Sequence, residues 1–105
     1  MPDIKYCGGV EEAVRIANSA MKSRVGFSPH CPSGPISLLA SAHVCASLDE
    51  RVILEHAVEE FEYRHEFIDP FEVIRNGQLR MPDGAGLGAD LNPESLKKYG
   101  EYFTL

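Results

Sequence analysis

The sequence lacks several features that define other classes of protein. Its 105 residues hold 10 basic against 16 acidic side chains, for a formal net charge of −6 at pH 7. They contain no cluster of lysine and arginine that would release counterions from a phosphate backbone, so we expect no nucleic-acid partner. No apolar run reaches the roughly 18 residues of a membrane span. The opening MPDIKYCGG has neither the basic nor the apolar region of a signal peptide, so we expect no membrane partner either.

Cysteine is scarce, and its pattern excludes two kinds of site. Cys7, Cys31 and Cys45 are odd in number and lie far apart, without a CxxC or zinc-ligand spacing. Reduced cysteines of this kind are typical of the cytosol, and we predict a cytoplasmic protein. A nucleophilic Cys31 beside His30 is a weaker alternative, because adjacent residues of an extended chain point to opposite faces.

The first half of the chain alternates between helical and extended patterns. Hydrophobic residues make up 44% of the sequence and charged residues 25%, as in an ordinary small globular domain. Apolar spacing predicts an amphipathic helix over 10–23 and an almost wholly apolar, buried helix over 35–48. Short strands are predicted over 25–29 and 52–54, the second of them buried. This order is typical of parallel βα units.

The second half of the chain lacks this alternation and is predicted to consist of loops, a hairpin and one last helix. The polar stretch 59–65 predicts a loop with room for one helical turn. Asn76-Gly77 between two short apolar runs predicts a hairpin with a type I′ turn. The glycine-rich loop 83–88 does not fit a phosphate-binding loop, because no strand precedes it and no lysine follows in register. Asn92 is expected to cap a last helix over 93–100.

Three polar residues lie where the predicted strands end. Asp3, His30 and Glu55 are separated by 27 and 25 positions, about one βα unit each. Because the carboxyl ends of parallel barrel strands meet at one active-site rim, these side chains are expected to converge. His30 is then a catalytic histidine on that rim, and a buried structural histidine is the alternative.

Four motifs carry a resemblance to a known family. PDIKYCGG, SPHCPSGPIS, VILEH and LRMPDGAGLGADLNPESLKKY follow one another over nearly the whole chain. In this order they resemble the C-terminal part of the enolase superfamily, in particular the mandelate racemase/muconate lactonizing enzyme family and its sugar-acid dehydratases. The resemblance implies an α/β fold: a partial (β/α)8 TIM barrel within one domain, 1–105. Residues 1–68 would form the last three βα units, and 69–105 the hairpin, the glycine-rich loop and the C-terminal helix.

The resemblance also implies a role for each site residue. Asp3 and His30 would form a His–Asp dyad, and Glu55 would act with them and contact the carboxylate of the substrate. Apart from the resemblance, Lys5 lies two residues after Asp3, which leaves a minor substrate contact open beside the alternative of a barrel-mouth or surface lysine. The implied reaction is abstraction of the proton α to a carboxylate with Mg²⁺ assistance, and we expect dehydration of an acid sugar. A racemase or epimerase, or a catalytically silent assembly domain, are the alternatives.

The sequence departs from the family in what it omits. The family's Mg²⁺-binding carboxylates, its second acid/base residue and its capping domain have no counterpart here. We therefore expect a C-terminal fragment that is inactive in isolation and binds no Mg²⁺ of its own. Because three parallel strands cannot close a barrel, we also expect a homo-oligomer or self-association through open sheet edges.

Overall fold

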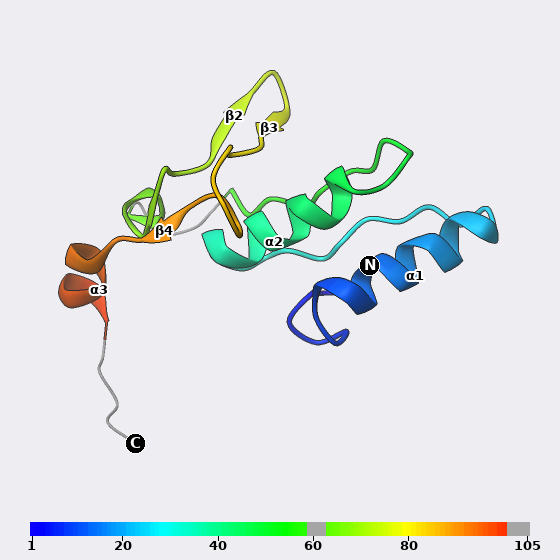
Figure 1. Ribbon diagram of the computed structural model, residues 1–105, viewed down its shortest axis with the longest axis horizontal. Coiled ribbons are helices and arrows are strands. Elements are labelled where there is room, and N and C mark those ends of the chain that lie inside the picture. Colours follow the sequence, from blue (N-terminus) through cyan, green and yellow to red (C-terminus); the bar gives the residue numbers. More distant parts are fainter. Residues whose placement is uncertain (59–62, 101–105) are drawn as a thin grey trace.

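Two helices dominate the first half of the molecule. The computed structural model describes residues 1–58 and 63–100 (Figure 1). Helix α1 spans Val10–Lys22, as predicted, and buries Ala13 and Ala17. Glu11 and Glu12 lie in its first turn and Lys22 in its last, so all three charges match the helix dipole.

Helix α2 is the most buried element of this half. It spans Pro35–Ala46 and begins with proline at its first position after Gly34. Only Ile36 and Ala46 among its residues are exposed, which confirms the predicted burial on most faces. A helix of this kind needs packing partners around most of its circumference.

An extended segment joins the two helices and passes between them (Figure 1). Its Phe27 is buried in a cluster with Ile4, with Ala13 and Ala17 of α1, and with Val44 of α2. This cluster fixes the segment against both helices. The end of the segment, at His30, is thereby held beside the first residues of the chain.

The strands predicted over 25–29 and 52–54 do not form. Among the described residues, the first half contains a single isolated parallel bridge, between Asp3 and His30. In this bridge the His30 N–H donates to Pro2 O at 2.9 Å. Ile53 is 80% exposed, so the prediction of a buried strand there is wrong. A strand requires a paired neighbour, and an apolar run cannot provide that neighbour locally.

The second half contains two small antiparallel pairs. Strand β1, Ile68–Asp69, pairs with β4, Asp90–Leu91. Strands β2, Val73–Arg75, and β3, Gln78–Arg80, form the predicted hairpin. Asn76 and Gly77 have φ angles of 52° and 72°, both positive, as a type I′ turn requires.

The last helix packs on a short 3₁₀ turn. The turn η1, Arg64–Glu66, lies in the predicted loop 59–65, of which 59–62 are outside the described residues. Helix α3, Pro93–Tyr99, is capped by Asn92 as predicted. Ser95 Oγ of α3 donates to Glu66 O at 2.7 Å, and the rings of Tyr63 and Tyr99 stack at 4.2 Å.

The described chain is more open than a typical domain of its length. Its radius of gyration is 14.7 Å, whereas compact domains of about 100 residues measure roughly 13 Å. Among residues 1–58 and 63–100, no helix combines the length and apolar character that a membrane crossing requires.

Candidate active site

The structure brings the first two predicted site residues into direct contact. His30 Nδ1 lies 3.1 Å from Asp3 Oδ2. The parallel bridge between the same two residues sets this distance, because it places their backbones side by side. The Asp3 side chain is 7% exposed, whereas that of His30 is 45% exposed. The pair thus consists of a buried carboxylate behind an imidazole that faces solvent.

Hydrogen bonding determines the charge and tautomer of this pair. Burial raises the pKa of Asp3, but the Lys5 backbone N–H bond, the His30 bond and the nearby Lys5 charge outweigh it, so the pKa lies below its ordinary value of 3.8. An ionised carboxylate only accepts hydrogen bonds, so Nδ1 of His30 carries the hydrogen. Nε2 is then the unprotonated, basic nitrogen of the neutral ring.

Glu55 lies on the other side of the imidazole. Its Oε2 is 4.0 Å from His30 Nε2, beyond hydrogen-bond length. The same oxygen accepts a bond from the backbone N–H of Cys31 at 2.8 Å. That bond anchors Glu55 near Nε2 without occupying the nitrogen.

Lys5 completes the group of predicted residues. Its Nζ lies 3.8 Å from Asp3 Oδ2 and contacts Ser33 Oγ. Its backbone N–H donates to Asp3 Oδ1 at 2.9 Å. Lys5 therefore supports the carboxylate of the pair with its backbone and carries a partly exposed positive charge beside it.

All four predicted residues lie in one place, with the elements of a general acid–base site. A basic ring nitrogen is oriented by a buried carboxylate through the opposite nitrogen, which is the arrangement that makes histidine a proton-transfer group. A second carboxylate lies near that nitrogen and an ammonium group lies beside the first carboxylate, and both can bind polar groups of a ligand. The buried structural histidine considered as the alternative for His30 does not match its 45% exposed side chain.

Sequence reasoning missed the backbone N–H of Cys31 and the side chains of Ser33 and Arg64. The Cys31 N–H orients Glu55, and Arg64 Nη1 donates to Ser33 O at 2.9 Å. No residue type marks a backbone donor, since nearly every residue has one. Arg64 lies 31 positions from Ser33, so only the folded chain relates them.

The thiol of Cys31 takes no part in this arrangement. It is buried, and this burial raises its pKa above the ordinary value of 9.0. A thiol of that kind is a poor nucleophile at neutral pH, so the weaker Cys31 alternative is disfavoured. His43 also lies outside this arrangement, and its Nε2 is 3.1 Å from Leu87 O.

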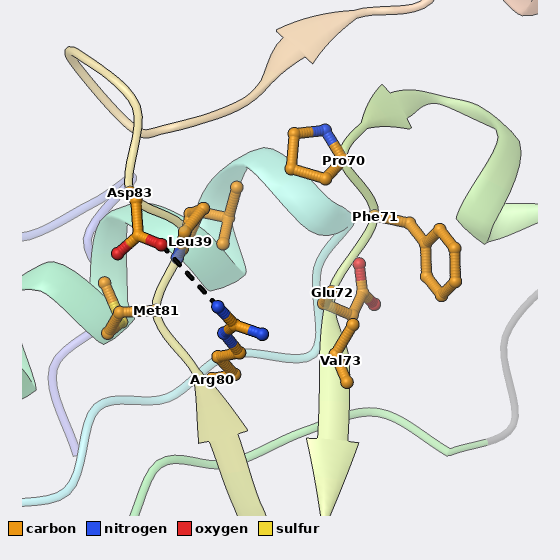
Figure 2. Close-up of a pocket in the computed structure, with 9 residues that line it drawn as sticks. Leu39, Pro70, Phe71, Glu72, Val73, Arg80, Met81 and Asp83 are labelled. Carbon is orange, nitrogen blue, oxygen red and sulfur yellow. Dashed lines mark ion pairs between the residues drawn. The ribbon is translucent and has the colours of Figure 1, made fainter.

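Two hollows lie away from the four site residues. One, of about 260 Å³, is bounded by Leu39, by the segment Pro70–Val73 and by residues 80–83 (Figure 2). The other adjoins the glycine-rich loop and is lined in part by Asp69, Asp83 and Asp90. Three carboxylates would repel a phosphate, in agreement with the exclusion of a phosphate-binding loop.

A divalent metal does not fit the residues present. Within the described parts of the chain, no three His, Cys, Asp or Glu side chains are grouped so as to hold an ion. Mg²⁺ requires near-octahedral oxygen ligands. The Asp3 carboxylate is already engaged by Lys5 and His30, and Glu55 by Cys31.

Comparison with known proteins matches this chain to one family. Residues 1–95 match the family model described as enolase C-terminal domain-like. The D-galactonate dehydratase of Xanthomonas campestris pv. campestris (strain B100) is 35% identical over 108 aligned positions, which cover 95% of this chain and 28% of that protein. The D-xylonate dehydratase of Haloferax volcanii is 28% identical over 93% of this chain and 24% of its own length. The chain thus spans about a quarter of the length of these curated relatives.

Solved structures agree with the sequence match. A mandelate racemase/muconate lactonizing enzyme-like protein from Rubrobacter xylanophilus DSM 9941 superposes with a TM-score of 0.86 at 35% identity, over 97% of this chain and 26% of that one. A protein from Burkholderia xenovorans strain LB400, solved with magnesium and fumarate, has a TM-score of 0.78 at 24% identity over 87% of this chain and 23% of its own. This second likeness concerns the fold alone.

Proposed function

This chain belongs to the enolase C-terminal domain-like family, an α/β barrel family, and from that premise we propose that it supplies the His–Asp half of a sugar-acid dehydratase site. The substrate class is an acid sugar, and the reaction begins with removal of the proton α to its carboxylate. In this proposal residues 1–68 act as the last three βα units of a (β/α)8 barrel, and 69–105 as its C-terminal hairpin, loop and helix. The complete enzyme acts in the cytoplasm.

One observation carries the proposal. His30 Nδ1 is bonded to a buried Asp3 carboxylate while Nε2 faces outward, 4.0 Å from Glu55. The 35% identity to D-galactonate dehydratases supports an acid sugar as the substrate class. The dyad explains proton transfer, and the flanking Glu55 and Lys5 provide polar contacts for a carboxylate and hydroxyl groups.

His30 Nε2 is the atom that exchanges a proton with the substrate. As neutral imidazole it accepts a proton from carbon, and as imidazolium it gives a proton to a departing hydroxyl, which leaves as water. Asp3 holds Nδ1–H in place and stabilises the positive charge that the ring gains. The pair therefore needs no movement of its own during the transfer.

Glu55 and Lys5 bind the part of the substrate that becomes negatively charged. Loss of the α-proton places charge on the carboxylate oxygens as an enediolate. Lys5 attracts that charge, and Glu55 lies beside it as a polar contact for the substrate carboxylate. The family resemblance implies Mg²⁺ as a further partner of the enediolate, but the described residues do not form its site.

A chimeric enzyme tests the proposal. Residues 1–105 replace the matching C-terminal quarter of the Xanthomonas campestris D-galactonate dehydratase, and turnover of D-galactonate is measured with deuterium incorporation from solvent. In this background we expect His30→Asn to lower turnover by about 10²- to 10⁴-fold, because asparagine cannot take up a proton.

The exposed His65, which lies outside the group, provides the matched control. His65→Asn should leave turnover within about twofold, a change of under half a kcal/mol in the activation barrier. Near-normal turnover in His30→Asn would show that His30 is structural. Deuterium exchange without loss of water would favour a racemase or epimerase instead.

A further inference from the structure

A buried ion pair contacts segments next to the four candidate site residues Asp3, Lys5, His30 and Glu55, which we call the active-site group. Arg64 Nε donates to Glu72 Oε1 at 2.6 Å, and the two side chains are only 10% and 9% exposed. Burying two charges costs solvation energy that their mutual attraction rarely exceeds, so a buried pair is weak evidence of stabilisation. Its presence calls for another explanation.

The same guanidinium group reaches the loop that follows His30. Arg64 Nη1 donates to the carbonyl oxygen of Ser33 at 2.9 Å. Glu72 immediately precedes β2, as Figure 2 shows. The planar fork of arginine can hold two acceptors at once in fixed directions. Arg64 therefore links the segment before β2 to Ser33.

The loop held by Arg64 carries two contacts of the active-site group. Ser33 Oγ contacts Lys5 Nζ, and two positions earlier the N–H of Cys31 donates to Glu55 Oε2 at 2.8 Å. A shift of the Ser33 carbonyl would move both the Ser33 hydroxyl that accepts from Lys5 and the Cys31 N–H that donates to Glu55, because they lie within one short stretch of backbone. The positions of Lys5 and Glu55 around His30 thus depend on this loop.

The residue after Glu55 adjoins the ion pair as well. His56 Nε2 lies 3.6 Å from Glu72 Oε1. Glu72 consequently adjoins both the guanidinium group of Arg64 and the side chain of His56, the residue after Glu55. The buried pair thus contacts two separate segments, one shortly after His30 and one directly after Glu55.

We propose that Arg64 and Glu72 are positioning residues, which hold the 31–34 loop so that Lys5 and Glu55 keep their places around His30. The proposal rests on the proposed function, since these places matter for proton transfer at His30. Arg64 acts through Ser33 and Cys31, and neither Arg64 nor Glu72 touches the substrate.

Amide hydrogen exchange of the 105-residue chain, measured by NMR, tests the proposal. The double variant Arg64→Gln/Glu72→Gln removes both charges together and so leaves no unpaired buried charge. We expect the Cys31 N–H to lose protection roughly tenfold, the effect of losing one hydrogen bond to a charged group, while the amides of α1 keep theirs. Arg64→Lys should be intermediate, because lysine lacks the fork that reaches both acceptors.

Arg80→Gln is the matched control, since it removes an exposed arginine whose partner, Asp83, is also exposed. It should leave Cys31 exchange unchanged. Equal loss of protection at Cys31 and throughout α1, or unchanged protection at Cys31, would overturn the proposal. If the double variant does not fold, the test uses Arg64→Lys instead and compares the loss of amide protection at Cys31 with that in α1.

Turnover of D-galactonate by the chimeric enzyme separates this proposal from the proposed function. A large loss of turnover in His30→Asn would support the sugar-acid site. Near-normal turnover in that variant would count against the site, while the exchange result at Cys31 still decides the role of Arg64. A change in Cys31 amide exchange in Arg64→Lys would support the positioning role of Arg64 whether or not the sugar-acid site is supported.

Discussion

At the scale of single residues, one carboxylate governs the candidate site. Asp3 is buried, yet it stays ionised because the Lys5 backbone, the His30 ring and the Lys5 charge all favour the anion. The folded state therefore binds a proton at Asp3 less readily than the unfolded chain does. This difference links the stability of the fold to pH.

We expect Asp3→Asn to destabilise the chain at neutral pH and to lose this effect in acid. Between the lowered folded pKa and the unfolded value near 3.8, the unfolded chain binds more protons, so wild-type stability falls as pH decreases through that window. At pH 7 the variant should lose roughly 2 kcal/mol of unfolding free energy, the contribution of a hydrogen bond to a charged group. Urea unfolding at pH 7 and below pH 3.8 provides the measurement.

Asp83→Asn is the control for this prediction. The Asp83 side chain is 93% exposed and lies 3.6 Å from Arg80, whose side chain is 77% exposed. Exposed pairs contribute little, so the control should stay within a few tenths of a kcal/mol of wild type at both pH values. If the free energies of unfolding of Asp3→Asn and wild type differed by the same amount at every pH, the link to ionisation of Asp3 would be contradicted.

At the scale of elements, the hairpin shows how a local signal specifies local structure. Asn76 and Gly77 both have positive φ, and the turn brings Val73 opposite Arg80. A Cβ at Gly77 would meet nothing within 4 Å. Glycine is needed there for its backbone conformation and not for space.

We predict that Gly77→Ala weakens the β2–β3 pair by about 1 kcal/mol, the cost of placing a side chain in the left-handed region. Exchange protection of the hairpin amides is the direct measurement. Gly26→Ala is the matched control, because Gly26 also has open space around it but no positive φ. The control should be neutral or slightly stabilising. If the hairpin amides were equally protected in Gly77→Ala and Gly26→Ala, a side chain at position 77 would not strain the turn.

At the scale of the whole molecule, apolar side chains remain uncovered. Val25, Ile53 and Val58 are 58%, 80% and 87% exposed, and all three lie in segments outside helices and strands. The radius of gyration of 14.7 Å agrees with an open arrangement. Exposed apolar surface of this kind typically marks an interaction site.

We expect the chain to self-associate through these segments. Light scattering should give a mean mass above 11.6 kDa that rises with concentration. Ile53→Lys should lower that mass, because a charged side chain resists burial. Gln78→Lys adds the same charge on the exposed hairpin and should not change it. A concentration-independent mass of 11.6 kDa for the wild type would disprove self-association.

We also predict that the isolated chain binds Mg²⁺ only weakly. The described residues contain no group of three metal-binding side chains, and the Asp3 and Glu55 carboxylates are engaged. Calorimetry should therefore show no stoichiometric site in the micromolar range, and Asp3→Asn should not alter the weak heats. A one-to-one micromolar site would contradict this prediction.

Short-range patterns in the sequence identified much of this structure. The helices at Val10–Lys22 and Pro35–Ala46, the Asn76-Gly77 hairpin and the Asn92 cap depend on contacts within a few residues. Such contacts can be predicted from the order of residues, because they depend on apolar periodicity, turn residues and capping residues. The spacing of Asp3, His30 and Glu55 also indicated that these residues would meet.

Long-range pairing accounts for what the patterns did not show. The apolar run 52–54 predicted a buried strand, but Ile53 lies exposed because no neighbouring strand pairs with it among the described residues. The Cys31 N–H on Glu55 and the reach of Arg64 to Ser33 join residues 24 and 31 positions apart. Residue order can suggest which side chains do chemistry, but the distances and orientations between them arise from packing between segments remote in the chain.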